Sequence, residues 1–179
     1  MSKIFGIGLP RTGTASLSEA LTILGYKTRH YPKYIDRARQ YDALVDSPVC
    51  NCYIELDQKY PNSKFILTTR EINRWLSSCK KASKRFKWHS LNPDGRCGPE
   101  VYQSHMDLFG SVEYDRDRFI DGYGSHLKKV LNYFEGRDNL LIFEVSDGWN
   151  RLCSFLDKEI PVQNFPHRNK SKDTETIAG

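Results

Sequence analysis

A chain of 179 residues, of which 39% are hydrophobic and 12% aromatic, is long enough for one domain with a buried core, so we expect residues 1–179 to form a single domain. Its net charge of +5 favours an anionic ligand, and no apolar stretch approaches the roughly 20 residues of a membrane-spanning helix. The first expected strand leaves no room for a signal peptide, and the five cysteines lack the spacing of a zinc site. We therefore expect a cytoplasmic protein with reduced thiols and no metal.

Residues 3–26 predict a short buried strand, a tight polar loop and an amphipathic helix, in that order. The strand is an apolar run of β-prone residues that ends before Gly8 and Pro10. The helix is indicated by apolar residues at helical spacing, namely Leu17, Ala20, Leu21 and Leu24. Gly25 follows, at a position where a helix end favours a residue with positive φ.

The loop between them, LPRTGTAS, has the chemistry of an anion site. Free N–H groups and the positive end of a helix dipole point at such a loop. Gly13 lets the backbone approach an anion closely, and Arg11 adds a cation. Four hydroxyls complete the donors: Thr12, Thr14, Ser16 and Ser18. An ordinary capped turn between a strand and a helix is the alternative interpretation.

The loop departs from the ATP-binding pattern G-x-x-x-x-G-K-[ST] at two positions that matter for chemistry. Aligned from Gly8, the pattern places Thr14 where a lysine is needed and Ala15 where a hydroxyl binds Mg²⁺. The clamp on the β- and γ-phosphates and the metal ligand are therefore both missing. We expect the loop to hold a phosphate without metal-assisted hydrolysis, and a P-loop kinase is the less favoured function.

The rest of the chain alternates strands with helices. Strands are expected at residues 27–31, 43–45, 64–69 and 140–145, and helices at 34–41, 52–60, 72–87, 100–109 and 115–135, before a last helix capped by Asp147. This spacing predicts βα units, and hence an α/β fold with three α/β/α layers around a mostly parallel sheet. Residues 80–115, with a break at 89–99, are expected to form a lid or acceptor region, and residues 160–179 a surface tail.

Ligands bind at the carboxyl ends of parallel strands, and three polar segments are expected at such ends. They are residues 11–16, residues 46–48 and Arg70. Ser78 follows Arg70 by eight residues, about two helical turns, so an arginine fork and a hydroxyl can face one phosphate. A helix-capping arginine with a solvated serine is the alternative.

Together, these motifs resemble those of the P-loop sulfotransferases, which transfer sulfuryl groups from 3′-phosphoadenosine 5′-phosphosulfate (PAPS). The family's loop P-K-S-G-T-T corresponds to residues 10–15, and its arginine and serine at a spacing of eight correspond to Arg70 and Ser78. The segments GLPRTGTASL, FILTTREINRWLSS and FEVSDGWNRLCSFL…FPHRN are similar to a short sulfotransferase-like subgroup. The resemblance covers most of residues 3–169.

The resemblance implies a P-loop NTPase-like sulfotransferase fold and transfer of a sulfuryl group from PAPS to a hydroxyl acceptor, a small molecule or a carbohydrate, without metal or nucleic acid. The implied cofactor-binding residues are Arg11, Thr12, Gly13, Thr14, Ala15, Ser16, Arg70 and Ser78. Arg11 is also implied as a catalytic donor at the reacting end. It replaces the family's lysine, and Ala15 replaces a hydroxyl, so a non-catalytic nucleotide-binding or polyanion-binding module on the same fold is the alternative function.

The base that removes the acceptor proton is expected to be Asp46, which ends the strand between the two phosphate motifs. Related sulfotransferases carry a catalytic histidine or acidic residue at this place. Desolvation is expected to raise the pKa of Asp46 toward a useful value. A cap of the turn at Ser47-Pro48 is the alternative role of Asp46, and His30 and Glu55 are alternative bases.

Other polar residues receive weaker assignments. His126 falls on the apolar stripe of its helix and is expected to be a core residue. Arg168 and Lys170 are candidates for reaching the 3′-phosphate. A solvated helix face is expected from the basic run Lys80, Lys81, Lys84, Arg85 and Lys87, with steering of anions as its alternative role.

Overall fold

The computed structural model describes residues 2–32, 34–86 and 98–168, which contain a five-stranded sheet in the order β2-β3-β1-β4-β5. The strands are β1 (Ile4–Gly6), β2 (Thr28–His30), β3 (Ala43–Val45), β4 (Lys64–Thr68) and β5 (Leu140–Phe143). All four pairs of neighbouring strands are parallel, so each connection crosses over the sheet. The expected parallel sheet is confirmed.

Helices alternate with the strands over the described residues. The α-helices are α1 (Thr14–Ile23), α2 (Tyr53–Lys59), α3 (Ile72–Phe86), α4 (Pro99–Phe109), α5 (Arg116–Tyr133) and α6 (Gly148–Leu156). Short 3₁₀ helices are η1 (Ile35–Gln40), η2 (Val49–Asn51) and η4 (Val145–Asp147). The helix expected over residues 34–41 is thus a 3₁₀ helix, bounded on both sides by extended residues in the short link between β2 and β3.

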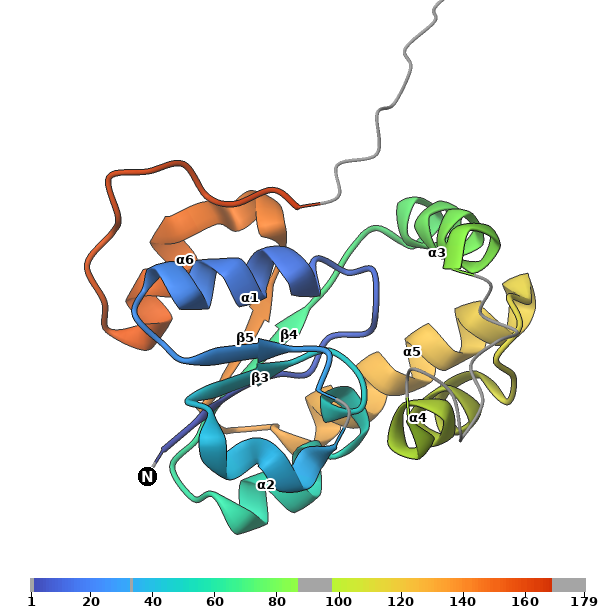
Figure 1. The fold of residues 1–179 in the computed structure, drawn as a ribbon, viewed down its shortest axis with the longest axis horizontal. Coiled ribbons are helices and arrows are strands. Elements are labelled where there is room, and N and C mark those ends of the chain that lie inside the picture. The colour runs from blue at the N-terminus through green and yellow to red at the C-terminus, as the bar shows by residue number, and fades with distance from the viewer. Residues whose placement is uncertain (1, 33, 87–97, 169–179) are drawn as a thin grey trace, which may run out of the picture.

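Helices cover both faces of the sheet. On one face, α1 and α6 pack through residues such as Leu17 and Trp149 against β1, β3, β4 and β5. On the other face, η1, α2 and α5 pack through residues such as Leu56 and Val130. Figure 1 shows α1 and α6 together on one side of the sheet and α2 on the opposite side. The expected α/β/α layers are confirmed. Burial on both faces explains why β1, β3 and most of β4 are apolar, whereas the edge strand β2 is polar and partly exposed.

A third hydrophobic cluster joins α3, α4 and α5 to the loop that follows β1. Trp75, which is fully buried, lies at its centre, with ring centroids 6.2 Å from Phe109, 5.9 Å from Phe119 and 4.8 Å from Tyr123. Leu9 of the loop belongs to the same cluster. The loop is therefore anchored to this group of helices as well as to the sheet.

Two expectations about helix ends have different outcomes. Gly25 has a φ of +90°, and the N–H of Tyr26 donates to the carbonyl of Leu21 at 3.0 Å, so the predicted end of α1 is confirmed. Asp147 precedes α6 as predicted, but its side chain does not cap that helix. Its carboxylate instead accepts from the N–H of Glu144 at 2.9 Å and from Arg151 at 3.1 Å, because η4 turns the chain back on itself just before α6.

The regions expected to be a lid and a tail are described in part. The former contains the end of α3, all of α4 and the segment before α5, whereas residues 87–97 lie outside the described residues. The tail passes over α6 to reach α1 at Arg168, the last described residue (Figure 1). No helix in the described part of the chain is long and apolar enough to cross a membrane. The four cysteines within it, Cys50, Cys52, Cys79 and Cys153, are free thiols, as expected.

Candidate active site

The loops after β1, β3 and β4 meet because these three strands are neighbours in the sheet. The loop after β1 passes so close to the end of β4 that a Cβ atom on Gly8 would lie 1.9 Å from the Thr68 hydroxyl oxygen. Gly13, just before α1, has a φ of +113°. Each glycine is thus required by the path of the loop, Gly8 for close approach and Gly13 for its backbone conformation.

The two residues with predicted catalytic roles share an unusual backbone conformation. Arg11 has a φ of +74° and Asp46 a φ of +82°. Both angles lie in the left-handed region of backbone conformation, which residues other than glycine rarely adopt. Such conformations cost free energy and persist where the surroundings hold them, often at functional sites. Asp46 is held through its N–H, which donates to the carbonyl of Gly6 at 3.1 Å.

Several loop hydroxyls are used inside the protein. The Thr12 hydroxyl donates to the carbonyl of Leu9 at 2.6 Å and lies 2.6 Å from the Thr68 hydroxyl. The Thr14 hydroxyl donates to Asp46, and the Ser16 hydroxyl accepts from the N–H of Arg168 at 2.9 Å. These side chains therefore shape the loop. The donors that remain for an anion include the first N–H groups of α1, which have no acceptor within the helix, the Ser16 hydroxyl proton and the Arg11 side chain.

The residues of the second predicted phosphate site converge on Arg11. The Nε of Arg11 donates to the Ser78 hydroxyl at 3.1 Å, and a guanidinium nitrogen of Arg70 donates to the carbonyl of Arg11 at 3.3 Å. All three residues are half-buried. Ser78 is thus neither solvated nor isolated, and the structure brings both predicted phosphate motifs into one cluster with two cations.

Asp46 contacts the start of α1 through Thr14 and is almost completely buried. One carboxylate oxygen accepts from the Thr14 hydroxyl and lies 3.1 Å from Nε2 of His30. The other accepts from the N–H of Ser47 at 2.6 Å. Burial acts to raise the pKa of Asp46, but the hydrogen bond and charge of His30, with the bonds from Thr14 and Ser47, outweigh it and hold the pKa below its ordinary value. The expectation that the pKa of Asp46 is raised toward a useful value is therefore wrong, although burial acts in that direction.

The alternative bases lie in different surroundings. His30 ends β2, and its side chain is 38% exposed, against 6% for Asp46. Glu55 is exposed in the first turn of α2, which packs on the face of the sheet opposite α1. His126 is buried, with Nε2 2.9 Å from the carbonyl of Ile7, so its predicted place in the core is confirmed. His30 is the alternative base that the fold brings to Asp46.

A shallow hollow of about 450 Å³ lies next to this pair. It is lined by Ala15, Ser18, Glu19, Thr22, His30 and Arg168. The Arg168 guanidinium is paired with Glu19 across this hollow, with its second nitrogen 3.0 Å from the carboxylate. The hollow therefore connects the first turns of α1 to the exposed side of His30.

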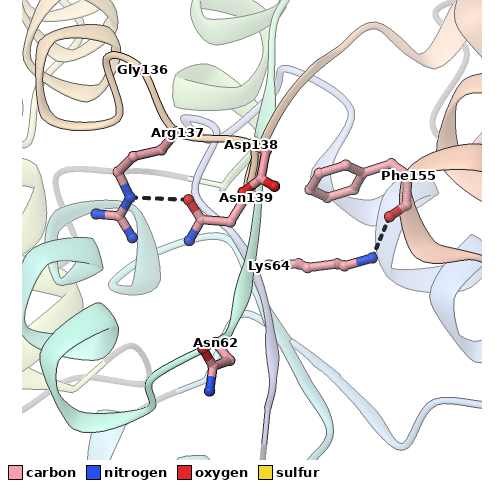
Figure 2. A pocket seen from close by; sticks show the side chains of 7 residues that line it. All are labelled: Asn62, Lys64, Gly136, Arg137, Asp138, Asn139 and Phe155. Atoms are coloured by element: carbon pink, nitrogen blue, oxygen red, sulfur yellow. Dashed lines mark hydrogen bonds between the residues drawn. The ribbon is translucent and has the colours of Figure 1, made fainter.

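A second hollow, of about 780 Å³, lies at the amino-terminal ends of β4 and β5 (Figure 2). Both of its cations already have partners. Lys64 donates to the carbonyl of Phe155 at 2.5 Å, and Arg137 binds Asp57 through two nitrogens at 2.8 Å each. Because it lies at the opposite edge from the predicted phosphate residues, this hollow is no rival anion site.

Two aromatic residues that the sequence did not indicate as functional, Trp75 and Tyr123, also contact the site. Trp75 and Tyr123 lie in the helices expected at residues 72–87 and 115–135 and received no functional role from the sequence. The Trp75 indole N–H donates to the carbonyl of Pro10 at 2.9 Å, and the Tyr123 hydroxyl bonds to the backbone of Arg70. Their polar atoms were the available signal, since a buried tyrosine or tryptophan usually finds a hydrogen-bond partner.

The family model described as "Sulfotransferase domain" matches residues 3–41 and 37–174, which together are most of the chain. The protein belongs to the sulfotransferase domain family. The two matches overlap between β2 and β3, in the segment that contains η1.

This sulfotransferase-domain protein is similar to a curated protein in sequence and to a solved structure in fold. "Ava biosynthesis cluster protein M" of Aspergillus versicolor is 28% identical, over 92% of this chain and 80% of the relative. The crystal structure of mouse sulfotransferase SULT7A1 complexed with PAP matches with a TM-score of 0.48 and 14% identity, over 89% of this chain. This chain spans 60% of the length of that mouse protein.

Proposed function

We propose that this protein transfers a sulfuryl group from PAPS to a hydroxyl acceptor. The observation that carries the proposal is the meeting of Arg11, Arg70 and Ser78 at a loop whose next residues, through Thr14, contact a buried carboxylate and a half-exposed imidazole. Membership of the sulfotransferase domain family supports the reaction class. PAPS brings an activated sulfuryl group and, on its ribose, a second phosphate that matches the second motif.

In this proposal, one set of hydrogen-bond donors binds each end of the nucleotide. The first N–H groups of α1 and Arg11 hold the phosphosulfate, and Arg70 with Ser78 holds the 3′-phosphate. Arg11 lies between the two sites, because its Nε bonds to Ser78 while its carbonyl accepts from Arg70. Donors of this kind stabilise the charge that grows on the leaving phosphate.

The acceptor proton goes to the pair formed by His30 and Asp46. As the acceptor oxygen bonds to sulfur, the bond between sulfur and the 5′-phosphate oxygen breaks, and the phosphate keeps the electron pair. His30 is the member that an acceptor can reach, since its side chain is 38% exposed. Asp46 orients the imidazole and stabilises its positive charge, which refines the base role first predicted for Asp46. The hollow of about 450 Å³ beside His30 receives a small-molecule or carbohydrate acceptor.

Calorimetric titration with 3′-phosphoadenosine 5′-phosphate (PAP) and with AMP tests the nucleotide assignment. We expect PAP to bind more tightly than AMP, and Arg70→Ala to weaken PAP binding by roughly 10- to 100-fold, as for a hydrogen bond to a charged group. Arg116→Ala removes an exposed arginine of α5 and is the matched control. Equal affinity for PAP and AMP, or an unchanged affinity in Arg70→Ala, contradicts the proposal.

A transfer assay separates the enzyme from a module that only binds nucleotide. Labelled PAPS is offered with panels of alcohols, phenols and carbohydrates, and sulfated product is measured. Nucleotide binding without transfer to any acceptor would favour the non-catalytic alternative, which Arg11 and Ala15 suggest. Turnover of ATP that requires Mg²⁺ would favour a kinase instead.

A further inference from the structure

A single hydroxyl on α5 holds both backbone polar groups of Arg70. The Tyr123 hydroxyl donates to the carbonyl of Arg70 at 2.9 Å and lies 3.2 Å from its N–H, which donates back. Arg70 lies beyond the end of β4, where the ladder of the sheet no longer supplies partners. Tyr123, 53 residues away in sequence, takes the place of a neighbouring strand at this point.

The position of the Arg70 backbone decides where its guanidinium reaches. That guanidinium spans from β4 to the loop after β1, where it donates to the carbonyl of Arg11 at 3.3 Å. A shift of the Arg70 backbone would therefore move the cation relative to both Arg11 and Ser78. Multidentate binding of a phosphate depends on such relative positions more than on charge alone.

The Tyr123 ring is itself fixed by Trp75. The two rings lie 4.8 Å apart, and Trp75 is fully buried. The indole N–H of Trp75 donates to the carbonyl of Pro10 at 2.9 Å, immediately before Arg11. Trp75 therefore contacts the backbone just before Arg11, and its neighbour Tyr123 contacts the backbone of Arg70.

We infer that Tyr123 is a positioning residue that sets the preference of this site for a nucleotide with a 3′-phosphate, acting through Arg70. The inference rests on the proposed function, because it takes Arg70 as a ligand of that phosphate. Tyr123 makes no contact with the phosphate itself. Its hydroxyl keeps the guanidinium at the distance from Arg11 that one bisphosphate nucleotide requires.

The test is the ratio of PAP affinity to AMP affinity, measured by calorimetry on the full chain. Tyr123→Phe keeps the ring and loses both hydrogen bonds, and we expect the ratio to fall about tenfold while AMP affinity changes less than about twofold. Tyr133→Phe is the matched control, since it removes a hydroxyl on the same helix that donates to Asp57 at 2.8 Å, and it should keep the ratio. In an Arg70→Ala background, Tyr123→Phe should lower the ratio no further.

The outcomes separate this inference from the proposed function. A wild-type protein that binds PAP no more tightly than AMP overturns both. A wild-type preference that Tyr123→Phe retains overturns the inference alone, as does a further fall in the Arg70→Ala background. Circular dichroism checks that each variant is folded. If Tyr123→Phe does not fold, Tyr123→Leu removes the hydroxyl with a smaller apolar side chain, and a ratio equal to wild type there also overturns the inference.

Discussion

Asp46 and His30 are adjacent in space but differ in their exposure to solvent. Their side chains lie 3.1 Å apart, yet that of Asp46 is 6% exposed and that of His30 is 38% exposed. A carboxylate with several donors stays ionised, whereas an exposed imidazole can exchange a proton with a substrate. At the scale of the residue, this difference in burial supports the different roles proposed for two groups that the sequence offered as alternative bases.

Substitution of His30 tests this division. If His30 receives the acceptor proton, His30→Gln should lower kcat for sulfuryl transfer by about 10²- to 10⁴-fold. The affinity for PAP should change little, because His30 lies outside the cluster of Arg11, Arg70 and Ser78. His167→Gln, at an exposed histidine of the tail, is the control. Near wild-type turnover in His30→Gln would return the role of base to Asp46.

Acid unfolding tests the lowered pKa of Asp46. Because this pKa is lower in the folded than in the unfolded state, where it is about 3.9, the unfolded state binds more protons in this range. The stabilisation is complete at neutral pH and is lost as pH falls from about 5 through the folded pKa. Asp46→Asn should cost about 1–3 kcal/mol at pH 7, and urea unfolding should show that this difference shrinks toward pH 3. Asp121→Asn, on the surface of α5, should follow the wild type; a constant deficit in Asp46→Asn would contradict the assignment.

At the scale of the element, helix α5 contains two glycines, one in a tightly packed place and one facing open space. A Cβ atom at Gly122 would lie 2.4 Å from the carbonyl oxygen of Leu108 and 2.6 Å from the Phe109 ring. A Cβ atom at Gly124 would meet nothing within 4 Å. Gly122 thus permits the close approach of α4 and α5, and Gly124 only weakens the helix.

Alanine substitutions at these positions should have opposite signs. Gly122→Ala should destabilise the fold by about 1–3 kcal/mol through overpacking, and Gly124→Ala should stabilise it by about 0.5–1 kcal/mol through helix propensity. Chemical unfolding measures both, each variant serving as the control for the other. Two changes of the same sign would show that the packing of α4 on α5 differs from that described.

Local patterns predicted most elements because they depend on short-range periodicity. The strands β1, β3, β4 and β5 were recognisable as largely apolar runs, and α1 from the spacing of Leu17, Ala20, Leu21 and Leu24. The 3₁₀ geometry of η1 could not be predicted, since a short polar segment has no periodicity that distinguishes a 3₁₀ helix from an α-helix. The side chain of Asp147 was misassigned because Glu144 and Arg151 compete for it.

At the scale of the molecule, the site is assembled from segments across the chain. Arg70, Asp46 and Arg168 each contact the loop after β1 or the start of α1, because β1, β3 and β4 are neighbours and the tail returns over α6 to α1. The Asp57–Arg137 pair, by contrast, ties the opposite edge. That residues 1–179 form one domain, and that the protein works in the cytoplasm, stay predictions.

The amino-acid sequence by itself determined the order of strands and helices, the glycine-containing loop after β1 and the two phosphate motifs that indicate the family. These depend on residues that are close in the chain. Only the tertiary structure decided that His30 is the partner of Asp46, that Tyr123 holds Arg70, and that the pKa of Asp46 falls instead of rising. The physical reason is that these contacts join residues from 16 to 53 positions apart, and at Asp46 the balance between burial and hydrogen bonding depends on such distant partners.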